Sequence, residues 1–224
     1  MAQDVTYLSY LKIPELLALQ EPLSDGPEHD ELLFIVIHQT YELWFKQILH
    51  ELKRADERLR DGDLHQSLGV LRRVRTIMKT LVSQVDILET MTPLQFNAFR
   101  DRLASSSGFQ STQFRDLESV FGRGDGCLWD ALLAFLERAG CRSSGAVTDD
   151  IVAVYRTRPD VALLLEELVD IDEGLQEWRY RHVKMVERTI GNKMGTGGSS
   201  GSEYLISTLF RPIFPELWEV RTRF

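Results

Sequence analysis

The sequence predicts an all-α protein, a helical bundle built on two long helices. Apolar residues recur at spacings of three and four over two long segments, and shorter segments of the same kind lie between Gly-, Pro- and Ser-containing breaks. No stretch shows the polar–apolar alternation of a half-buried strand. At 224 residues and 43% hydrophobic, the chain is expected to form one domain over residues 1–224, with an N-terminal arm over residues 1–28.

The first long helix is predicted from Asp30, its expected N-cap, to Arg60. Its apolar stripe consists of Phe34, His38, Tyr41, Phe45, Ile48 and Leu52. The sequence Asp61-Gly62-Asp63 ends this helix and starts the next, which should run from Leu64 to about Thr90.

Three shorter helices are predicted over Thr92–Ala104, Thr112–Phe121 and Cys127–Ala139. Thr92 is the expected N-cap of the first, with Pro93 in its first turn. Ser105–Gly108 is expected to be a loop, and Ser143–Gly145 a break.

The second long helix is predicted from Asp160 to Ile190 and stops at Gly191. Its apolar stripe consists of Leu168, Ile171, Leu175, Trp178, His182 and Val186. Two more short helices, separated by Pro212 and Pro215, are expected in the tail from Glu203.

Composition and charge narrow the function classes. The chain has 34 acidic and 26 basic residues and a formal charge of -8, which argues against nucleic-acid binding. Its longest apolar run, Leu32–Ile37, is far too short for a membrane helix, and we expect no signal peptide. Cys127 and Cys141 form no disulfide framework or CxxC motif, so we interpret them as reduced thiols of a cytoplasmic protein.

His38 and His182 interrupt the apolar stripes of the two long helices. A neutral imidazole in a core must satisfy one donor and one acceptor, so each can be a packed histidine bonded to a carbonyl. If the helices pack face to face, however, the two imidazoles are presented across one cavity. That arrangement suits a haem, with one imidazole as the only protein ligand of the iron and the other on the opposite face. Zinc is disfavoured, because it needs three or four close ligands.

Four of the seven residues of Gly195–Gly201 are glycine. Such a segment can be a flexible linker, or its backbone N–H groups can approach a ligand closely. It is not a Walker A loop, since no Gly-Lys-Ser/Thr follows, and it does not follow a strand. Its place just after the helix of His182 is consistent with a lid over a pocket.

Arg100 and two tyrosines have two interpretations each. The guanidinium of Arg100 can clamp a carboxylate through two parallel hydrogen bonds, or it can lie exposed over Phe96 and Phe99. Tyr7 and Tyr10 share one face of a helical turn in an apolar arm. That arm needs a surface to bury against, on its own body or on a second subunit.

Four blocks of the sequence resemble the tryptophan 2,3-dioxygenase family: HDELLFIVIHQTYELWFKQILHEL (His29–Leu52), ETMTPLQFNAFRDRL (Glu89–Leu103), SGFQSTQFR (Ser107–Arg115) and WRYRHVKMVERTIGNKMGTGGSSGSEYL (Trp178–Leu205). They cover about half of the chain, in the order of the family. The resemblance implies a cytoplasmic, all-helical homotetramer with haem b (iron protoporphyrin IX). Its activity would be insertion of O₂ into the indole C2–C3 bond of L-tryptophan, which gives N-formylkynurenine.

The resemblance also implies roles for individual residues near the haem. His182 matches the axial ligand of the iron, and His38 matches the distal histidine that faces the indole N–H. Ser107 matches a serine near the haem edge. Tyr7 and Tyr10 match tyrosines that complete the pocket of the neighbouring subunit.

The remaining matches concern the substrate. Phe34 and Phe96 match aromatic walls of the indole pocket. Arg100 matches the arginine that binds the substrate carboxylate, and Thr196 matches a threonine that contacts the substrate's ammonium and carboxylate groups. An aromatic slot with a polar end fits tryptophan, which has an apolar body and a zwitterionic end.

The chain is short for the family, and the shortened insert region is expected over residues 105–160. Two alternatives to the dioxygenase therefore stay open. One is a haem-dependent monooxygenase of tryptophan or a substituted tryptophan in secondary metabolism. The other is a non-catalytic haem sensor or carrier.

Overall fold

The computed structural model describes residues 4–26, 28–122, 126–191, 193–195 and 205–224. Over these residues the secondary structure is helical and contains no strand, which confirms the all-α prediction. Within the same residues, no helix combines the length and the apolar character that crossing a membrane requires.

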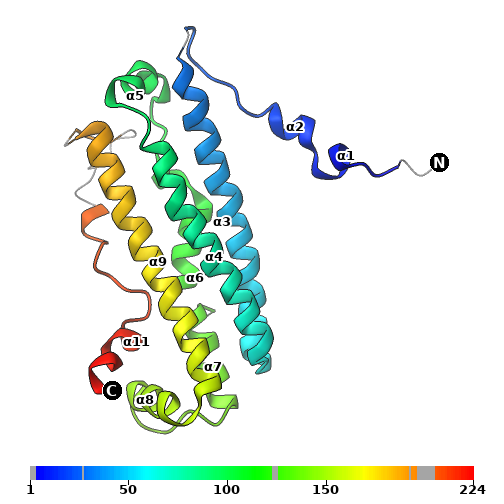
Figure 1. Cartoon of the computed structure of the whole chain (residues 1–224), viewed down its shortest axis with the longest axis vertical. Helices are drawn as coiled ribbons and strands as arrows, with labels where there is room; N and C mark the ends of the chain where they lie inside the picture. Colours follow the sequence, from blue (N-terminus) through cyan, green and yellow to red (C-terminus); the bar gives the residue numbers. More distant parts are fainter. Residues whose placement is uncertain (1–3, 27, 123–125, 192, 196–204) are drawn as a thin grey trace.

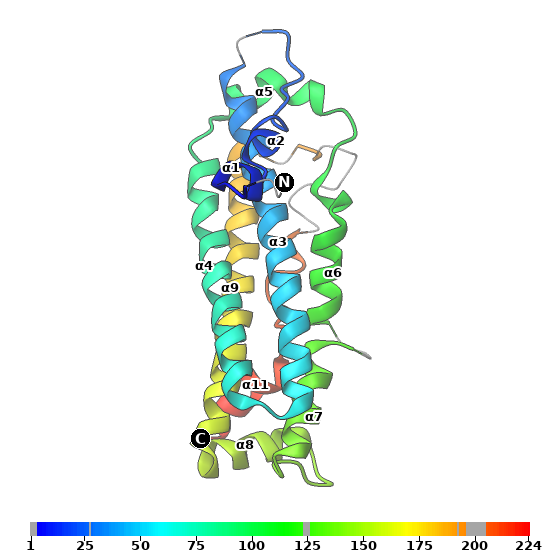
Figure 2. The ribbon, with the colours of Figure 1, turned by 90° about the vertical axis from the view of Figure 1, so that its right-hand side faces the viewer.

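Three long helices form the body of the bundle: α3 (His29–Asp61), α4 (Leu64–Leu88) and α9 (Pro159–Ile190). Helix α4 packs along both α3 and α9, as Figures 1 and 2 show. The bundle is completed by α6 (Thr112–Phe121) and α7 (Leu128–Arg138), which pack on α3. The two predicted long helices therefore both pack against a third helix of comparable length.

The two ends of the bundle are covered by short helices. Helix α5 (Pro93–Arg100) contacts both α3 and α9 at one end, and α8 (Val147–Thr157) lies across the other (Figure 1). The short 3₁₀ helices η1 (Asp101–Leu103) and η2 (Gly108–Gln110) lead from α5 to α6. The tail ends in α11 (Pro215–Glu219) and η4 (Val220–Arg223), beside α8.

The turn between α3 and α4 forms as its residues dictate. Gly62 ends α3 at φ 80°, a left-handed conformation that costs glycine little. The carboxylate of Asp63 then accepts a hydrogen bond of 3.0 Å from the amide of Gln66 and so caps α4. The predicted turn over residues 61–63 is confirmed.

The apolar core has two parts. The larger part runs along α3, α4, α7 and α9 and includes the fully buried Ile48, Leu52 and Leu164. A smaller cluster lies at the α5 end and consists of Ile37, Leu88, Met91, Phe96 and Phe99. The half-buried Phe34 and Met185 pack against the smaller cluster from α3 and α9. This end of the bundle is therefore where α3, α5 and α9 meet.

The N-terminal arm carries α1 (Tyr7–Leu11) and α2 (Ile13–Leu17) and projects away from the bundle (Figure 1). Its base is anchored on α3, because the buried carboxylate of Glu31 accepts hydrogen bonds from the amides of Leu23 and Ser24 at 2.7 and 3.1 Å. Beyond this anchor, both helices lack any buried residue.

Two expectations about local structure are wrong. Helix α3 begins at His29, so Asp30 lies in its first turn, where its charge favours the helix dipole, and Asp30 is not the N-cap. Helix α8 was not expected. Its segment is rich in β-branched residues, which have low helix propensity, and it folds where Ile151 and Val154 become buried against neighbouring helices.

Candidate active site

The two stripe histidines lie on different helices, near the end of the bundle that α5 covers. His38 lies on α3 and His182 on α9, in the part of both helices near α5. Burial, and after it the charge of His38, lowers the pKa of His182 to about 4. Ring contacts connect the two helices in this region: Trp178, which stacks on His182, lies 6.2 Å from the ring of Tyr41 on α3, centroid to centroid. Both histidines that the sequence singled out therefore lie toward the end where α3, α5 and α9 meet.

His38 has a defined tautomer. Its Nδ1 lies 2.7 Å from the carbonyl oxygen of Phe34, one turn earlier on α3. A carbonyl only accepts hydrogen bonds, so Nδ1 carries the proton and Nε2 of the neutral ring keeps its lone pair. Burial lowers the pKa of His38, which keeps the ring neutral at pH 7. The residue is nevertheless solvent-accessible, so a ligand can reach the imidazole.

His182 is held by an aromatic ring. The indole of Trp178 lies parallel to its imidazole, with 5.2 Å between ring centroids and an interplanar angle of 6°. Trp178 in turn packs against Tyr41 and Phe114, with centroids 6.2 and 5.4 Å apart. Trp178 was noted in the sequence only as a member of the stripe. Its position one turn before a candidate ligand is the signal that could have identified it.

Nearby polar groups are left without partners. Within the described part of the chain, neither ring nitrogen of His182 makes a hydrogen bond, and the buried Nε1 of Trp178 has no acceptor. A buried unpaired donor costs about 1–3 kcal/mol. The imidazole of His182 is neutral and half-buried, so one of its ring nitrogens has a lone pair that can coordinate an iron ion. This end of the bundle therefore fits a haem held by one histidine.

An aromatic wall lies beside His38. The ring of Phe34 is 4.1 Å from the imidazole of His38, 5.8 Å from Phe96 and 5.5 Å from Phe99, centroid to centroid. Phe96 and Phe99 meet edge to face at 5.4 Å. Phe34 comes from α3, and Phe96 and Phe99 come from α5. The capping box of Thr92 fixes where α5 begins and therefore where Phe96 and Phe99 lie. Phe34 and Phe96 lie together, as the resemblance implied.

Arg100 lies at the C-terminal end of α5, next to this wall. Its Nη2 donates a hydrogen bond of 2.6 Å to the carbonyl of Met194. Met194 directly precedes Gly195, so the guanidinium connects α5 to the start of the glycine-rich segment. Arg100 is half-buried and has further N–H groups that can reach an anion.

The other candidate residues are placed differently. Ser107 is the N-cap of η2, and its hydroxyl accepts a hydrogen bond of 3.4 Å from the amide of Phe109. Tyr7 and Tyr10 are 72% and 75% exposed on the arm, and the chain's own site does not include them. Thr196 lies outside the described residues.

Fold and site together define a class of protein. It is an all-α bundle in which three helices bring a pair of neutral histidines, an aromatic wall and an arginine to one end. A family model described as tryptophan 2,3-dioxygenase matches residues 1–126 and 136–224. The chain belongs to the tryptophan 2,3-dioxygenase family.

Curated relatives agree over their whole length. A tryptophan 2,3-dioxygenase of Herpetosiphon aurantiacus is 52% identical, covering 99% of each chain. One of Anaeromyxobacter dehalogenans is 51% identical over 97% of this chain and 95% of its own. One of Caulobacter vibrioides is 42% identical over 100% of both. The break in the family match, at residues 127–135, falls inside the region expected to be shortened.

Proposed function

We propose that this protein is a haem-dependent oxidoreductase that inserts both atoms of O₂ into the indole C2–C3 bond of L-tryptophan, giving N-formylkynurenine in the first step of the kynurenine pathway. The observation that carries the proposal is the aromatic wall of Phe34 and Phe96 against His38, at the end of the bundle where α9 carries the half-buried His182 and α5 ends at Arg100. Membership in the tryptophan 2,3-dioxygenase family supports it independently.

Haem b would be held by His182. The neutral imidazole offers its lone pair to the iron, and the ring of Trp178 fixes its orientation. Ser107, at the start of η2, is proposed to approach the edge of the porphyrin. When bound, haem supplies the redox chemistry with O₂ that no side chain provides.

The substrate would lie with its indole against Phe34 and Phe96. Burial of an aromatic body in such a slot supplies affinity, and polar groups at one end set its orientation. Arg100 is proposed to bind the carboxylate, and Thr196 to contact the ammonium and carboxylate groups. A guanidinium matches a carboxylate through two parallel N–H···O bonds, which orients as well as binds.

His38 positions the reacting ring. Its Nε2 keeps a lone pair because Nδ1 donates to Phe34, so Nε2 can accept the indole N–H hydrogen bond. This bond, together with the Arg100–carboxylate pair at the other end, fixes which indole carbons are presented for reaction. Positioning of this kind is sufficient, and His38 need not remove the proton. L-Tryptophan and O₂ sum to N-formylkynurenine, so no external electron donor enters the balance.

The arm is proposed to complete a partner's site in a homotetramer or dimer. Tyr7 and Tyr10 are exposed, as are Val5 at 78%, Leu8 at 54% and Leu17 at 70%. An extended arm with this much apolar surface requires a second subunit to cover it. The stripe of exposed Leu32, Val36 and Leu43 on α3 offers further apolar surface for that contact.

We also propose a cytoplasmic location. Cys127 is buried and Cys141 half-buried, and both are free thiols, as expected in a reducing compartment.

Isotopic labelling tests the proposed reaction. Reduced, haem-loaded protein is incubated with L-tryptophan under isotopically labelled O₂, and the product is analysed by mass spectrometry. We expect N-formylkynurenine with two labelled oxygen atoms. A single labelled atom would instead establish a monooxygenase, and a haem spectrum without any consumption of tryptophan would establish a sensor or carrier.

A further inference from the structure

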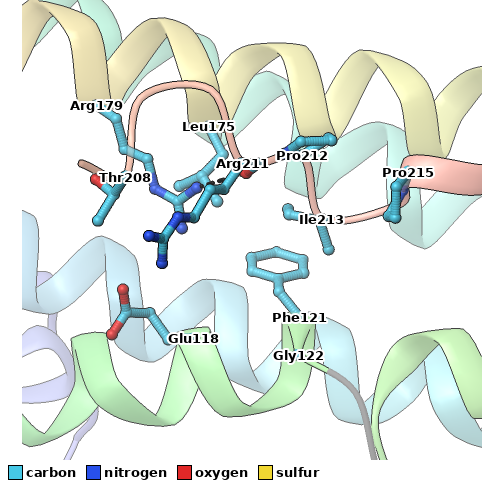
Figure 3. A pocket seen from close by; sticks show the side chains of 10 residues that line it. All are labelled: Glu118, Phe121, Gly122, Leu175, Arg179, Thr208, Arg211, Pro212, Ile213 and Pro215. Carbon is cyan, nitrogen blue, oxygen red and sulfur yellow. Dashed lines mark hydrogen bonds between the residues drawn. The ribbon is translucent and has the colours of Figure 1, made fainter. Parts of the chain in front are cut away.

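A cavity of about 400 Å³ lies between α6, α9 and the tail, apart from the residues of the candidate active site. Figure 3 shows its lining: Glu118, Phe121 and Gly122 from α6, Leu175 and Arg179 from α9, and Thr208, Arg211, Pro212, Ile213 and Pro215 from the tail. None of these residues belongs to the candidate active site. The cavity is within the size range of small-molecule sites.

The charges in this cavity are arranged at two poles. In Figure 3 the side chains of Arg179 and Arg211 lie on one side of the cavity, and that of Glu118 lies on the other. Nη1 of Arg179 donates to the backbone carbonyl of Arg211 at 3.0 Å, which holds the tail against α9. Within the described residues, the Glu118 carboxylate and the Arg211 guanidinium form no ion pair and no side-chain hydrogen bond, and Arg211 accepts from Arg179 only through its backbone carbonyl.

The floor between these poles is apolar. Phe121, Leu175 and Ile213 are each buried, with exposed fractions of 5%, 6% and 9%. Their side chains come from three different segments, so the floor forms only when the tail is docked. An apolar floor flanked by two cations and one anion is complementary to a ligand with an apolar body, a negatively charged group and a positively charged group.

We propose that this cavity binds a small apolar α-amino acid. Its carboxylate would lie between Arg179 and Arg211, since paired guanidinium groups bind carboxylates through charge-assisted hydrogen bonds. Its ammonium would meet Glu118, and its side chain would cover Phe121 and Ile213. The ligand supplies the ionic contacts that Glu118 and Arg211 do not make with each other.

Calorimetric titration of the haem-loaded protein with L-leucine tests this assignment. Leucine has the two charges and an aliphatic side chain, but no aromatic ring for the wall at Phe34. We expect saturable binding that Arg211→Ala weakens about tenfold or more, the scale of a charge-assisted hydrogen bond. Arg211→Ala keeps the backbone carbonyl of residue 211, so the hydrogen bond from Arg179 that holds the tail against α9 is retained. Arg54→Ala, at an exposed arginine of α3, is the matched control and should bind like the wild type.

A second comparison isolates the ammonium contact. 4-Methylpentanoate, which is leucine without its ammonium group, should bind wild-type protein about tenfold more weakly than leucine. Glu118→Gln should weaken leucine binding and should not weaken binding of 4-methylpentanoate. Glu118 and Arg211 are both exposed, so neither substitution should lower the thermal unfolding midpoint.

Several results would overturn the assignment. These are no saturable leucine binding, equal affinity in Arg211→Ala, or loss of binding in Arg100→Ala, which would place leucine in the active site. Equal affinity for leucine and 4-methylpentanoate would show that Glu118 does not bind an ammonium group. It would therefore refute the proposal that the ligand is an amino acid. The labelling experiment on tryptophan is unaffected by any of these outcomes, so the two proposals fail separately.

Discussion

At the scale of residues, the site depends on hydrogen bonds and ring contacts within single turns of helix. His38 bonds to the carbonyl of Phe34, and Trp178 stacks on His182, each over a spacing of four residues. A local contact of this kind fixes the tautomer or ring plane of a functional group without help from the rest of the fold. It is also visible in sequence, because residues four apart share a helix face.

The polar end of the proposed substrate site depends on Arg100. Arg100→Ala is expected to weaken L-tryptophan binding by about 1.5–3 kcal/mol, the scale of a charge-assisted hydrogen bond, measured by equilibrium titration. Arg100→Lys keeps the charge but loses the two-pronged geometry, so its affinity for L-tryptophan should lie between those of the wild type and Arg100→Ala. Arg102→Ala removes an exposed neighbouring arginine and should bind normally. An unchanged affinity in Arg100→Ala would refute the carboxylate role.

From the residues alone, the sequence singled out the two histidines, which interrupt apolar stripes, and Arg100, which has aromatic neighbours; the family resemblance added Phe34 and Phe96 as pocket walls. The sequence could not place Tyr7 and Tyr10, since α1 and α2 of the arm bury no residue against the bundle. Nor could it find the Arg100–Met194 contact, which joins residues 94 positions apart. Contacts between residues so far apart depend on how the helices pack, and they produce no periodic pattern in the sequence.

At the scale of elements, α8 shows how tertiary packing overrides propensity. The segment Val147–Thr157 has two acidic residues, Asp149 and Asp150, in its first turn and several β-branched residues after them. Its amphipathic pattern is brief and follows a Ser- and Gly-containing break. Only its neighbours make it a helix, because α9 and the tail cover Ile151 and Val154.

The carboxylate of Asp150 ties α8 to the preceding loop. It is buried and accepts hydrogen bonds from Arg142 Nη1 at 2.7 Å, Ser143 Oγ at 2.7 Å and the Ser143 amide at 3.1 Å. Burial alone would raise the pKa of Asp150, but the hydrogen bonds from Ser143 and the charge of Arg142 together lower it. The folded state therefore favours the ionised form.

Asp150→Asn is expected to lower the free energy of unfolding at pH 7 by about 1–3 kcal/mol, measured by urea denaturation. A carboxyl whose pKa is lowered by folding stabilises the protein above its unfolded pKa and loses that contribution as pH falls through the folded value. The difference between wild type and variant should therefore shrink below about pH 4. Asp149→Asn, at the exposed neighbour, is the control. A difference independent of pH would contradict the assignment.

At the scale of the whole molecule, one buried carboxylate docks the C-terminal tail onto α9. Asp172 is fully buried and accepts from the amides of Ile213 and Phe214 at 3.0 and 2.9 Å and from Trp218 Nε1 at 2.9 Å. The partners lie about 40 residues away in sequence, so this contact fixes where the chain returns after the glycine-rich segment. The cavity between α6, α9 and the tail exists only because of this docking.

Asp172→Asn is expected to lower the free energy of unfolding by about 2–3 kcal/mol, because an amide group would face donors that need an acceptor. Hydrogen exchange of the Phe214 amide should accelerate more than that of α4. Glu173→Gln, at the exposed adjacent position, should change neither the free energy of unfolding nor the hydrogen exchange of the Phe214 amide. Wild-type stability and protection in Asp172→Asn would show that the tail is held by its apolar contacts alone.

The central claim is that His182 ligates a haem and His38 faces it from the other helix. The most direct measurement is titration of cofactor-free protein with haem, followed by the Soret band of the wild type and of three histidine variants. We predict one haem per chain in the wild type, loss of stable binding in His182→Ala, and binding retained in His38→Ala and in the control His50→Ala, at an exposed position of α3. A wild type that stays colourless, or a His182→Ala variant with the wild-type spectrum and affinity, would contradict it.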